Sequence, residues 1–171
     1  MAMNNYLLII TLNVNGLNAP IKRHRIAEWV RKHDPHICCL QETHLRTKDL
    51  HRLKLKGWEQ IFQANGQGKK PEVAIFISYK IDFQRRAIKR DPEGHFIILK
   101  GRIHQEDIDI VNIYAPNIGA PKYIKKILED FKKDIDSNTI ILGDFSHPLC
   151  QKWLDLPNKI SRRILCHLTI P

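Results

Sequence analysis

Short apolar runs of strand length, each bounded by turn or polar residues, are the feature of this sequence that most restricts its fold. Runs of this kind are typical of buried β-strands. They predict strands within residues 7–16, 36–44, 58–63, 73–78, 81–88, 96–103, 108–116 and 139–145. No internal repeat or low-complexity linker separates them, so the pattern predicts a mixed α/β domain of the α+β kind.

Two longer segments have helical periodicity instead. Between residues 19 and 35, Pro20 suits a first helical turn and Pro35 enforces an end to the helix. A second helix is predicted within residues 121–136, where apolar side chains recur on one face at Ile124, Ile127, Leu128, Phe131 and Ile135. A shorter helical piece is expected around residues 47–55.

Length and composition favour one intracellular domain. The chain has 171 residues, 43% of them hydrophobic, which is enough for one core and too little for two. It has no apolar run of 18 residues and no signal-peptide pattern. We therefore expect a protein of the nucleus or cytoplasm that is not secreted, has no membrane partner, and keeps its four cysteines as thiols.

The charge is strongly positive. Lys and Arg number 28 against 18 Asp and Glu, giving a formal net charge of +10, which favours polyanions such as nucleic acid or an anionic membrane. The basic residues are scattered along the chain rather than gathered in one tail. A solvated basic surface without a specific partner is therefore an alternative for any single cluster.

Polar residues interrupt four of the apolar runs, and strand ends are where rigid scaffolds commonly present catalytic groups. The residues concerned are Asn13, Asn15, Glu42, His44, Tyr114, Asn117, Asp144 and Ser146. A carboxylate that holds a hard cation, a second that orients water, and a phenol and amides near phosphate oxygens would suit metal-assisted phosphodiester hydrolysis. Each residue taken alone is better explained as an ordinary turn or strand-end polar group, but the four strand ends together favour a site.

Two other chemistries are disfavoured. Asp144, Ser146 and His147 lie too close in sequence at a strand end for a charge-relay array, because neighbouring side chains point in different directions. A zinc site using Cys150, Cys166 and His167 is also disfavoured, since the adjacent Cys166 and His167 would face opposite sides. Cys38 and Cys39 fit a buried apolar strand.

The four motifs L-N-x-N-G, Q-E-T-H, N-I-Y-A-P-N and G-D-F, in this order, resemble those of the endonuclease/exonuclease/phosphatase superfamily. The text around them is similar to the endonuclease domain of mammalian long interspersed element (LINE) retrotransposon reverse transcriptases. The resemblance runs from about residue 9 to residue 149. It suggests a partial domain over residues 1–149, followed by an unrelated tail over 150–171 with one short helix near 158–168.

The resemblance implies a four-layer α/β-sandwich of the DNase I-like type, and a magnesium-dependent nick in DNA. By this likeness Glu42 would bind Mg²⁺ and Asn13 would support the metal and water network. Tyr114 would contact the scissile phosphate, and Asp144 would orient the attacking water. His44, Asn117 and Asn15 are candidates for substrate contact.

Three departures from the family pattern stand out. Ser146 replaces the Asn of G-D-F-N, leaving a degenerate catalytic position, and Glu72 stands where relatives usually have glycine. The later Asp and Asn pair and the Ser-Asp-His motif are also missing, as expected of a truncated sandwich. We therefore expect impaired catalysis, weak Mg²⁺ binding, salt-dependent non-specific DNA binding, and self-association through an open sheet edge. The alternatives are a non-catalytic basic DNA-binding module and a retroelement remnant without selected function.

Overall fold

The structure is a computed structural model that describes residues 7–45, 49, 52–53, 57–58, 60–64, 72–115, 120–143, 164–165 and 168–169. Its strands form two five-stranded sheets. Sheet A has the order β10-β1-β2-β4-β3, with β1 Ile9–Asn13, β2 Ile37–Gln41, β3 Gln60–Gln63, β4 Val73–Ile77 and β10 Leu168–Thr169. Sheet B has the order β5-β6-β7-β8-β9, with β5 Phe83–Arg90, β6 Phe96–Ile103, β7 Glu106–Ile113, β8 Thr139–Gly143 and β9 Ile164–Leu165.

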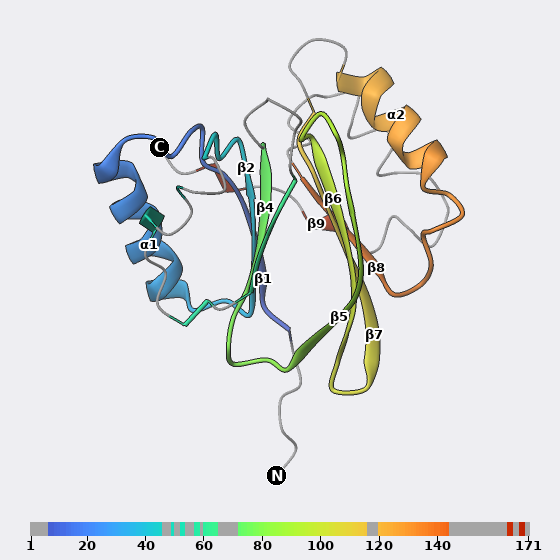
Figure 1. The fold of residues 1–171 in the computed structure, drawn as a ribbon, viewed down its shortest axis with the longest axis horizontal. Coiled ribbons are helices and arrows are strands. Elements are labelled where there is room, and N and C mark those ends of the chain that lie inside the picture. The colour runs from blue at the N-terminus through green and yellow to red at the C-terminus, as the bar shows by residue number, and fades with distance from the viewer. Residues whose placement is uncertain are drawn as a thin grey trace.

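Within the described residues, two helices cover the outer faces of the sheets. Figure 1 shows α1 (Pro20–His33) beside sheet A and α2 (Ala120–Asp130) beside sheet B, with the two sheets facing each other between them. The α/β-sandwich with four layers that the sequence suggested is therefore confirmed. As predicted, Pro20 begins α1, and the helix ends before Pro35 at a left-handed Asp34, whose N–H donates to Val30 O.

Apolar side chains fill the three interfaces between these layers. Ile26 and Val30 of α1 pack on Cys38 and Phe76 of sheet A. On the other side of the molecule, α2 and the turn that follows it pack Ile127 and Phe131 on Ile98 and Val111 of sheet B. The core between the sheets contains Ile37, Cys39, Ile75, Ile77, Ile97, Leu99, Ile110 and Leu142, all 0–1% exposed. Alternation along the inner strands thus gives both sheets two buried faces, whereas the edge strand β5 is largely exposed.

Strand direction brings the predicted polar strand ends to one edge. In sheet A, β1 pairs in parallel with β2, so that Asn13 lies opposite Gln41. In sheet B, β7 pairs in parallel with β8, so that Ile113 lies opposite Gly143. The carboxyl ends of all four strands therefore meet at the upper edge of the sandwich in Figure 1, which we call the rim.

The tail differs from the expected helix. Where a helix near residues 158–168 was predicted, residues 164–165 form β9 and residues 168–169 form β10, while residues 158–163 lie outside the described part of the chain. β9 pairs with Ile141 and Leu142 of β8, so these residues are not at the open edge that the sequence led us to expect. Both are buried. The domain boundary at residue 149 remains a prediction.

Cys38 and Cys39 are structural. Both are fully buried free thiols on β2, as predicted. Burial raises the pKa of Cys38 to about 12 and also raises the pKa of Cys39, so neither thiol is a ready nucleophile at neutral pH.

Candidate active site

Asn13 and Glu42 form the centre of the rim on sheet A. Asn13 ends β1, and Glu42 follows the last residue of β2. The Asn13 side-chain Nδ2 donates to Glu42 Oε1 at 2.9 Å, while Asn13 Oδ1 accepts from the Asn15 N–H at 3.0 Å. Asn13 therefore holds the Glu42 carboxylate in place and also stabilises the turn that follows β1.

The backbone around this pair adopts an uncommon conformation. Asn15, Glu42 and His44 have φ angles of 46°, 53° and 53°, in the left-handed region that residues other than glycine rarely adopt. The surrounding hydrogen bonds impose it: Val14 N donates to Gln41 O at 3.0 Å, and Gly16 N donates to Glu42 O at 2.6 Å. Backbone strain of this kind persists only where the surrounding fold stabilises it, and it is concentrated at functional sites.

His44 lies beside Glu72, the residue that departs from the family pattern. His44 Nε2 is 2.9 Å from Glu72 Oε2, close enough for an ion pair when the imidazole is protonated. Gly16, with φ of 80°, makes room for this ring, since a Cβ there would lie 3.2 Å from His44 Nδ1. Glu72 thus adds a second carboxylate near the rim.

Tyr114 and His95 contribute to the rim from sheet B. Tyr114 directly follows β7, and its ring centroid lies 6.4 Å from that of His95. His95 is held by Asp91, whose Oδ2 accepts from the His95 backbone N–H at 3.0 Å and from the Tyr123 hydroxyl at 3.3 Å. Burial, with Asp91 nearby, raises the pKa of Tyr123, so this hydroxyl remains a donor.

A chain of backbone hydrogen bonds joins the two halves of the rim. Thr43 N donates to Glu72 O at 3.4 Å, and Glu72 N donates to Gly94 O at 3.1 Å. One residue further along, His95 O accepts from Tyr114 N at 2.7 Å. The segment after Glu42 is thereby connected to the segment that carries Tyr114, and both sheets contribute to one rigid edge.

The structure brings together five of the eight predicted site residues. Asn13, Asn15, Glu42 and His44 lie together on sheet A, and Tyr114 lies at the same edge on sheet B. Asn117, Asp144 and Ser146 lie outside the described residues, as do His147 and the zinc candidates Cys150, Cys166 and His167. Their roles remain predictions.

Sequence reasoning gave no role to His95, Gln41 or Asn112, although Gln41 belongs to the motif Q-E-T-H and Asn112 to N-I-Y-A-P-N. The turn-forming D-P-E-G before His95 was the only local signal for that histidine. Gln41 and Asn112 are buried polar residues within apolar strands, and they contact each other across the two sheets at a separation of 71 residues. No local pattern reports such a contact.

The donors at the rim fit a hard divalent cation. Glu42 offers a carboxylate, and Mg²⁺ is commonly bound by one or two carboxylates while it keeps several of its waters. Within the described ranges, no three His, Cys, Asp or Glu side chains converge as a complete metal cage. Glu42, oriented by Asn13, is a described residue that could hold such an ion.

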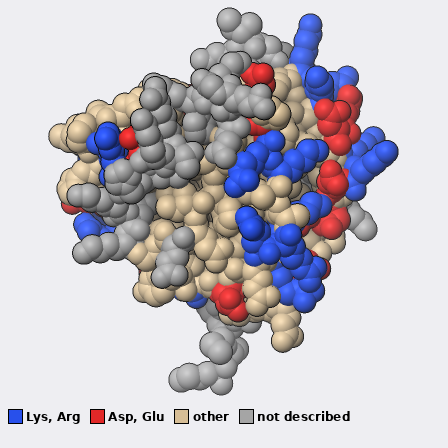
Figure 2. Space-filling view, in the orientation of Figure 1, with Lys and Arg blue, Asp and Glu red and all other residues tan. Residues whose placement is uncertain are grey.

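A basic edge lies beside the rim. Figure 2 shows Lys and Arg side chains gathered over β5 and its neighbours. β5 is the outermost strand of sheet B, and its exposed residues include Arg85, Arg86, Lys89 and Arg90, which we call the basic edge. Arg90 Nε donates to Gln63 O at 2.7 Å and so connects this edge to sheet A.

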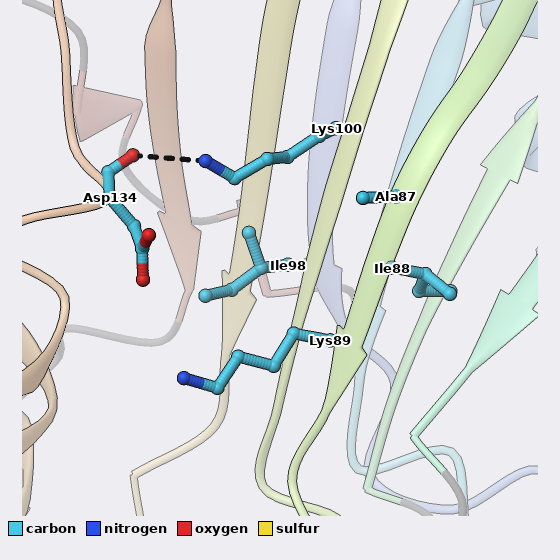
Figure 3. Close-up of a pocket in the computed structure, with 6 residues that line it drawn as sticks. All are labelled: Ala87, Ile88, Lys89, Ile98, Lys100 and Asp134. Carbon is cyan, nitrogen blue, oxygen red and sulfur yellow. Dashed lines mark hydrogen bonds between the residues drawn. The ribbon is translucent and has the colours of Figure 1, made fainter.

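A small hollow of about 110 Å³ lies on the outer face of sheet B, away from the rim. Figure 3 shows its lining residues, among them Ile98 and Lys89, with Lys100 donating to Asp134 O at 3.3 Å. Lys100 also lies 3.5 Å from Asp109, and the Lys89 ammonium lies 5.3 Å from the centre of the Phe131 ring. Both lysines are thus engaged within the protein, and the hollow is not part of the candidate site.

Comparison with known proteins agrees with this architecture. The DNA-(apurinic or apyrimidinic site) endonuclease of Dictyostelium discoideum is 30% identical over 120 residues, which are 68% of this chain and 32% of the relative. The chain thus spans about a third of that relative's length.

Two solved structures share the fold. D. rerio TDP2 complexed with single strand DNA product has a TM-score of 0.61 at 16% identity, covering 79% of this chain and 58% of that one. The endonuclease domain of TRAS1, a telomere-specific non-LTR retrotransposon, has a TM-score of 0.57 at 16% identity, covering 82% and 59%. The model of the Endonuclease/Exonuclease/phosphatase family matches residues 10–166. The chain therefore belongs to the endonuclease/exonuclease/phosphatase family.

Proposed function

We propose that this chain binds DNA phosphates at the rim together with Mg²⁺, and that its hydrolysis of phosphodiesters is impaired. The observation that carries the proposal is the Asn13–Glu42 pair, fixed on sheet A and tied by backbone hydrogen bonds to Tyr114 on sheet B. Glu42 would hold the cation, Asn13 would orient the carboxylate, and Tyr114 would contact a phosphate oxygen. A bound Mg²⁺ would supply charge stabilisation at the phosphate and a more acidic water.

DNA is the favoured polyanion for two reasons. The net charge of +10 and the basic edge attract a phosphate backbone. The similar Dictyostelium discoideum protein is a DNA-(apurinic or apyrimidinic site) endonuclease, and D. rerio TDP2, which shares the fold, is complexed with a single strand DNA product. Both support DNA as the ligand. No helix in the described part of the chain is long and apolar enough to cross a bilayer.

Impaired hydrolysis is proposed from the sequence. Ser146 stands where the family pattern has an amide that bridges catalytic groups. Loss of one group that stabilises the transition state commonly lowers the rate by a factor of about 10² to 10³. When several groups act in the same step, the loss of one also removes much of the effect of the others.

Supercoiled plasmid incubated with the purified protein tests this proposal. We expect no Mg²⁺-dependent nicking beyond that of Glu42→Gln or Asp144→Ala protein, because residual nicking would come from contaminants. EDTA provides the metal-free control. A Mg²⁺-dependent nick that disappears in either variant would show that the chain is a working nuclease and would contradict the proposed impairment.

Binding to a fluorescent DNA duplex should weaken steeply with salt. If about three phosphates are contacted, the dissociation constant should rise about 40-fold between 50 and 200 mM salt, because counterions released on binding drive association. Arg85→Ala protein should bind more weakly, with the slope against log salt reduced by about one for the lost phosphate contact. Lys32→Ala, which changes an exposed lysine on α1, is the matched control. Affinity that is constant across this salt range would refute phosphate-driven binding.

A further inference from the structure

A buried layer of three polar side chains lies directly beneath the rim, between the two sheets. It consists of Thr11 on β1, Gln41 on β2 and Asn112 on β7. Gln41 and Asn112 are fully buried, and Thr11 is 4% exposed. Below this layer the interface between the sheets is apolar, so these side chains form a polar floor under the candidate site.

The hydrogen bonds determine which way each amide points. Asn112 Nδ2 donates to Leu40 O at 3.1 Å and to Ala74 O at 3.0 Å, both in sheet A. Asn112 Oδ1 is therefore left to accept, and it does so from Gln41 Nε2 at 2.8 Å. The same Nε2 donates to Thr11 Oγ1 at 2.9 Å.

Gln41 is consequently left with one unused acceptor. Both N–H groups of its amide are engaged, whereas Gln41 Oε1 is buried without a hydrogen-bond donor among the described residues. Rotating the amide by half a turn would place Oε1 against Asn112 Oδ1, which is another acceptor. A buried acceptor without a donor is unfavourable unless a ligand or water satisfies it.

Gln41 directly precedes Glu42 in the chain, at the end of β2. Asn13 lies opposite Gln41 in the parallel register of β1 and β2, and Asn13 donates to the Glu42 carboxylate. Gln41 and the Glu42 carboxylate therefore both flank Asn13. A water bound to a cation carries strongly polarised O–H groups, which makes it a good donor for such an oxygen.

We infer that Gln41 Oε1 accepts a hydrogen bond from a water carried by the divalent cation at Glu42. Gln41 is then a positioning residue of the cation site, and Asn112 fixes its amide in the required orientation. The inference rests on the proposed cation binding at Glu42 and adds to it a residue that does not touch the ion.

Manganese binding, measured from the electron paramagnetic resonance signal of free Mn²⁺, tests this role without reference to catalysis. Gln41→Met should raise the dissociation constant about 10-fold, because loss of an outer-sphere partner commonly weakens metal binding 10- to 100-fold. Gln41→Glu should bind Mn²⁺ within about twofold of the wild type, since its protonated carboxyl can donate to Asn112 Oδ1 in place of Nε2 and keeps the second oxygen free.

Gln63→Met is the matched control. Gln63 is also a buried glutamine with an unused Oε1, but it lies on the edge strand β3 and donates to Leu45 O. Its substitution should perturb packing similarly and leave Mn²⁺ affinity within about twofold, whereas a merely structural effect of Gln41→Met would be reproduced by it.

The outcomes separate this inference from the proposed function. Tight Mn²⁺ binding that Glu42→Gln abolishes but Gln41→Met leaves unchanged would overturn the role of Gln41 alone. Absence of Mn²⁺ binding in the wild type, or binding insensitive to Glu42→Gln, would overturn both. If Gln41→Met does not fold, Gln41→Glu decides, because a 10-fold loss of affinity in that variant contradicts an oxygen directed at the hydrated ion.

Discussion

Replacing Phe131 with alanine should lower the free energy of unfolding by about 3–5 kcal/mol, the usual cost of truncating a buried phenylalanine to alanine. Phe131 is 2% exposed and follows α2 directly. Its ring meets that of Phe96 on β6 edge to face, with centroids 4.8 Å apart. It also packs with Ile127 and Val111, so the alanine variant would leave a cavity where α2 is attached to sheet B.

Urea denaturation followed by circular dichroism would measure this loss. Ile21→Ala is the control, because Ile21 is 65% exposed on α1 and its truncation should change stability by less than about 0.5 kcal/mol. Phe131→Leu should fall between the two, since leucine refills part of the cavity. If Phe131→Ala costs no more than Ile21→Ala, then α2 is not held on the sheet in the way described.

Asn112→Leu should also destabilise the fold, by about 2–4 kcal/mol. Leucine has the same number of side-chain heavy atoms as asparagine, with two methyl groups in place of the amide oxygen and nitrogen. The substitution removes two hydrogen bonds to carbonyls of sheet A and deprives the buried Gln41 amide of an acceptor. The loss is large because a buried donor without a partner retains its full desolvation cost.

A double-mutant cycle that combines Asn112→Leu with Gln41→Met measures the energy of the hydrogen bond between Gln41 and Asn112 apart from their other contacts. The double variant should be less destabilised than the sum of the single variants, by about 1 kcal/mol or more, because removing both partners leaves no unsatisfied amide. Strict additivity of the two changes in unfolding free energy would show that Gln41 and Asn112 do not act as a pair.

The sequence predicted those features of the fold that depend on local patterns. Both helices and eight strands were expected from apolar periodicity, and the meeting of strand ends at one edge followed from the polar residues that interrupt them. The limits of two strands differ most from expectation: β7, expected within residues 108–116, is found at Glu106–Ile113, and β5, expected within residues 81–88, is found at Phe83–Arg90. This edge strand is largely exposed and contains a bulge between Arg85 and Ala87, so it lacks a buried face that would mark its limits.

Contacts between distant segments account for the errors. The tail has apolar residues at helical spacing, but pairing of residues 164–165 with β8 and of residues 168–169 with β1 gives strands there. The hydrogen bond between Gln41 and Asn112 could not be predicted from local patterns either. In the sequence each residue is only a polar residue within or next to an apolar run, and the two are 71 positions apart. In both cases the deciding partner lies far away in the sequence.

The basic edge also bears on the expected self-association. Edge strands expose unpaired backbone groups that can pair with another chain, and charged side chains discourage this. Four basic residues on β5 would repel the same strand of a second copy. Self-association of the protein remains a prediction, and the charge of β5 disfavours it at this edge.

The two short strands of the tail have a mechanical consequence. β9 pairs in parallel with β8 of sheet B, and β10, which begins three residues after β9 ends, pairs in parallel with β1 of sheet A. A pulling force applied beyond β10 would therefore reach sheet A first and sheet B next. Such a force would pull parallel strands along their length, in shear, so that the hydrogen bonds between the strands would have to break together rather than one after another. The short segment from β9 to β10 would therefore transmit the force to both sheets.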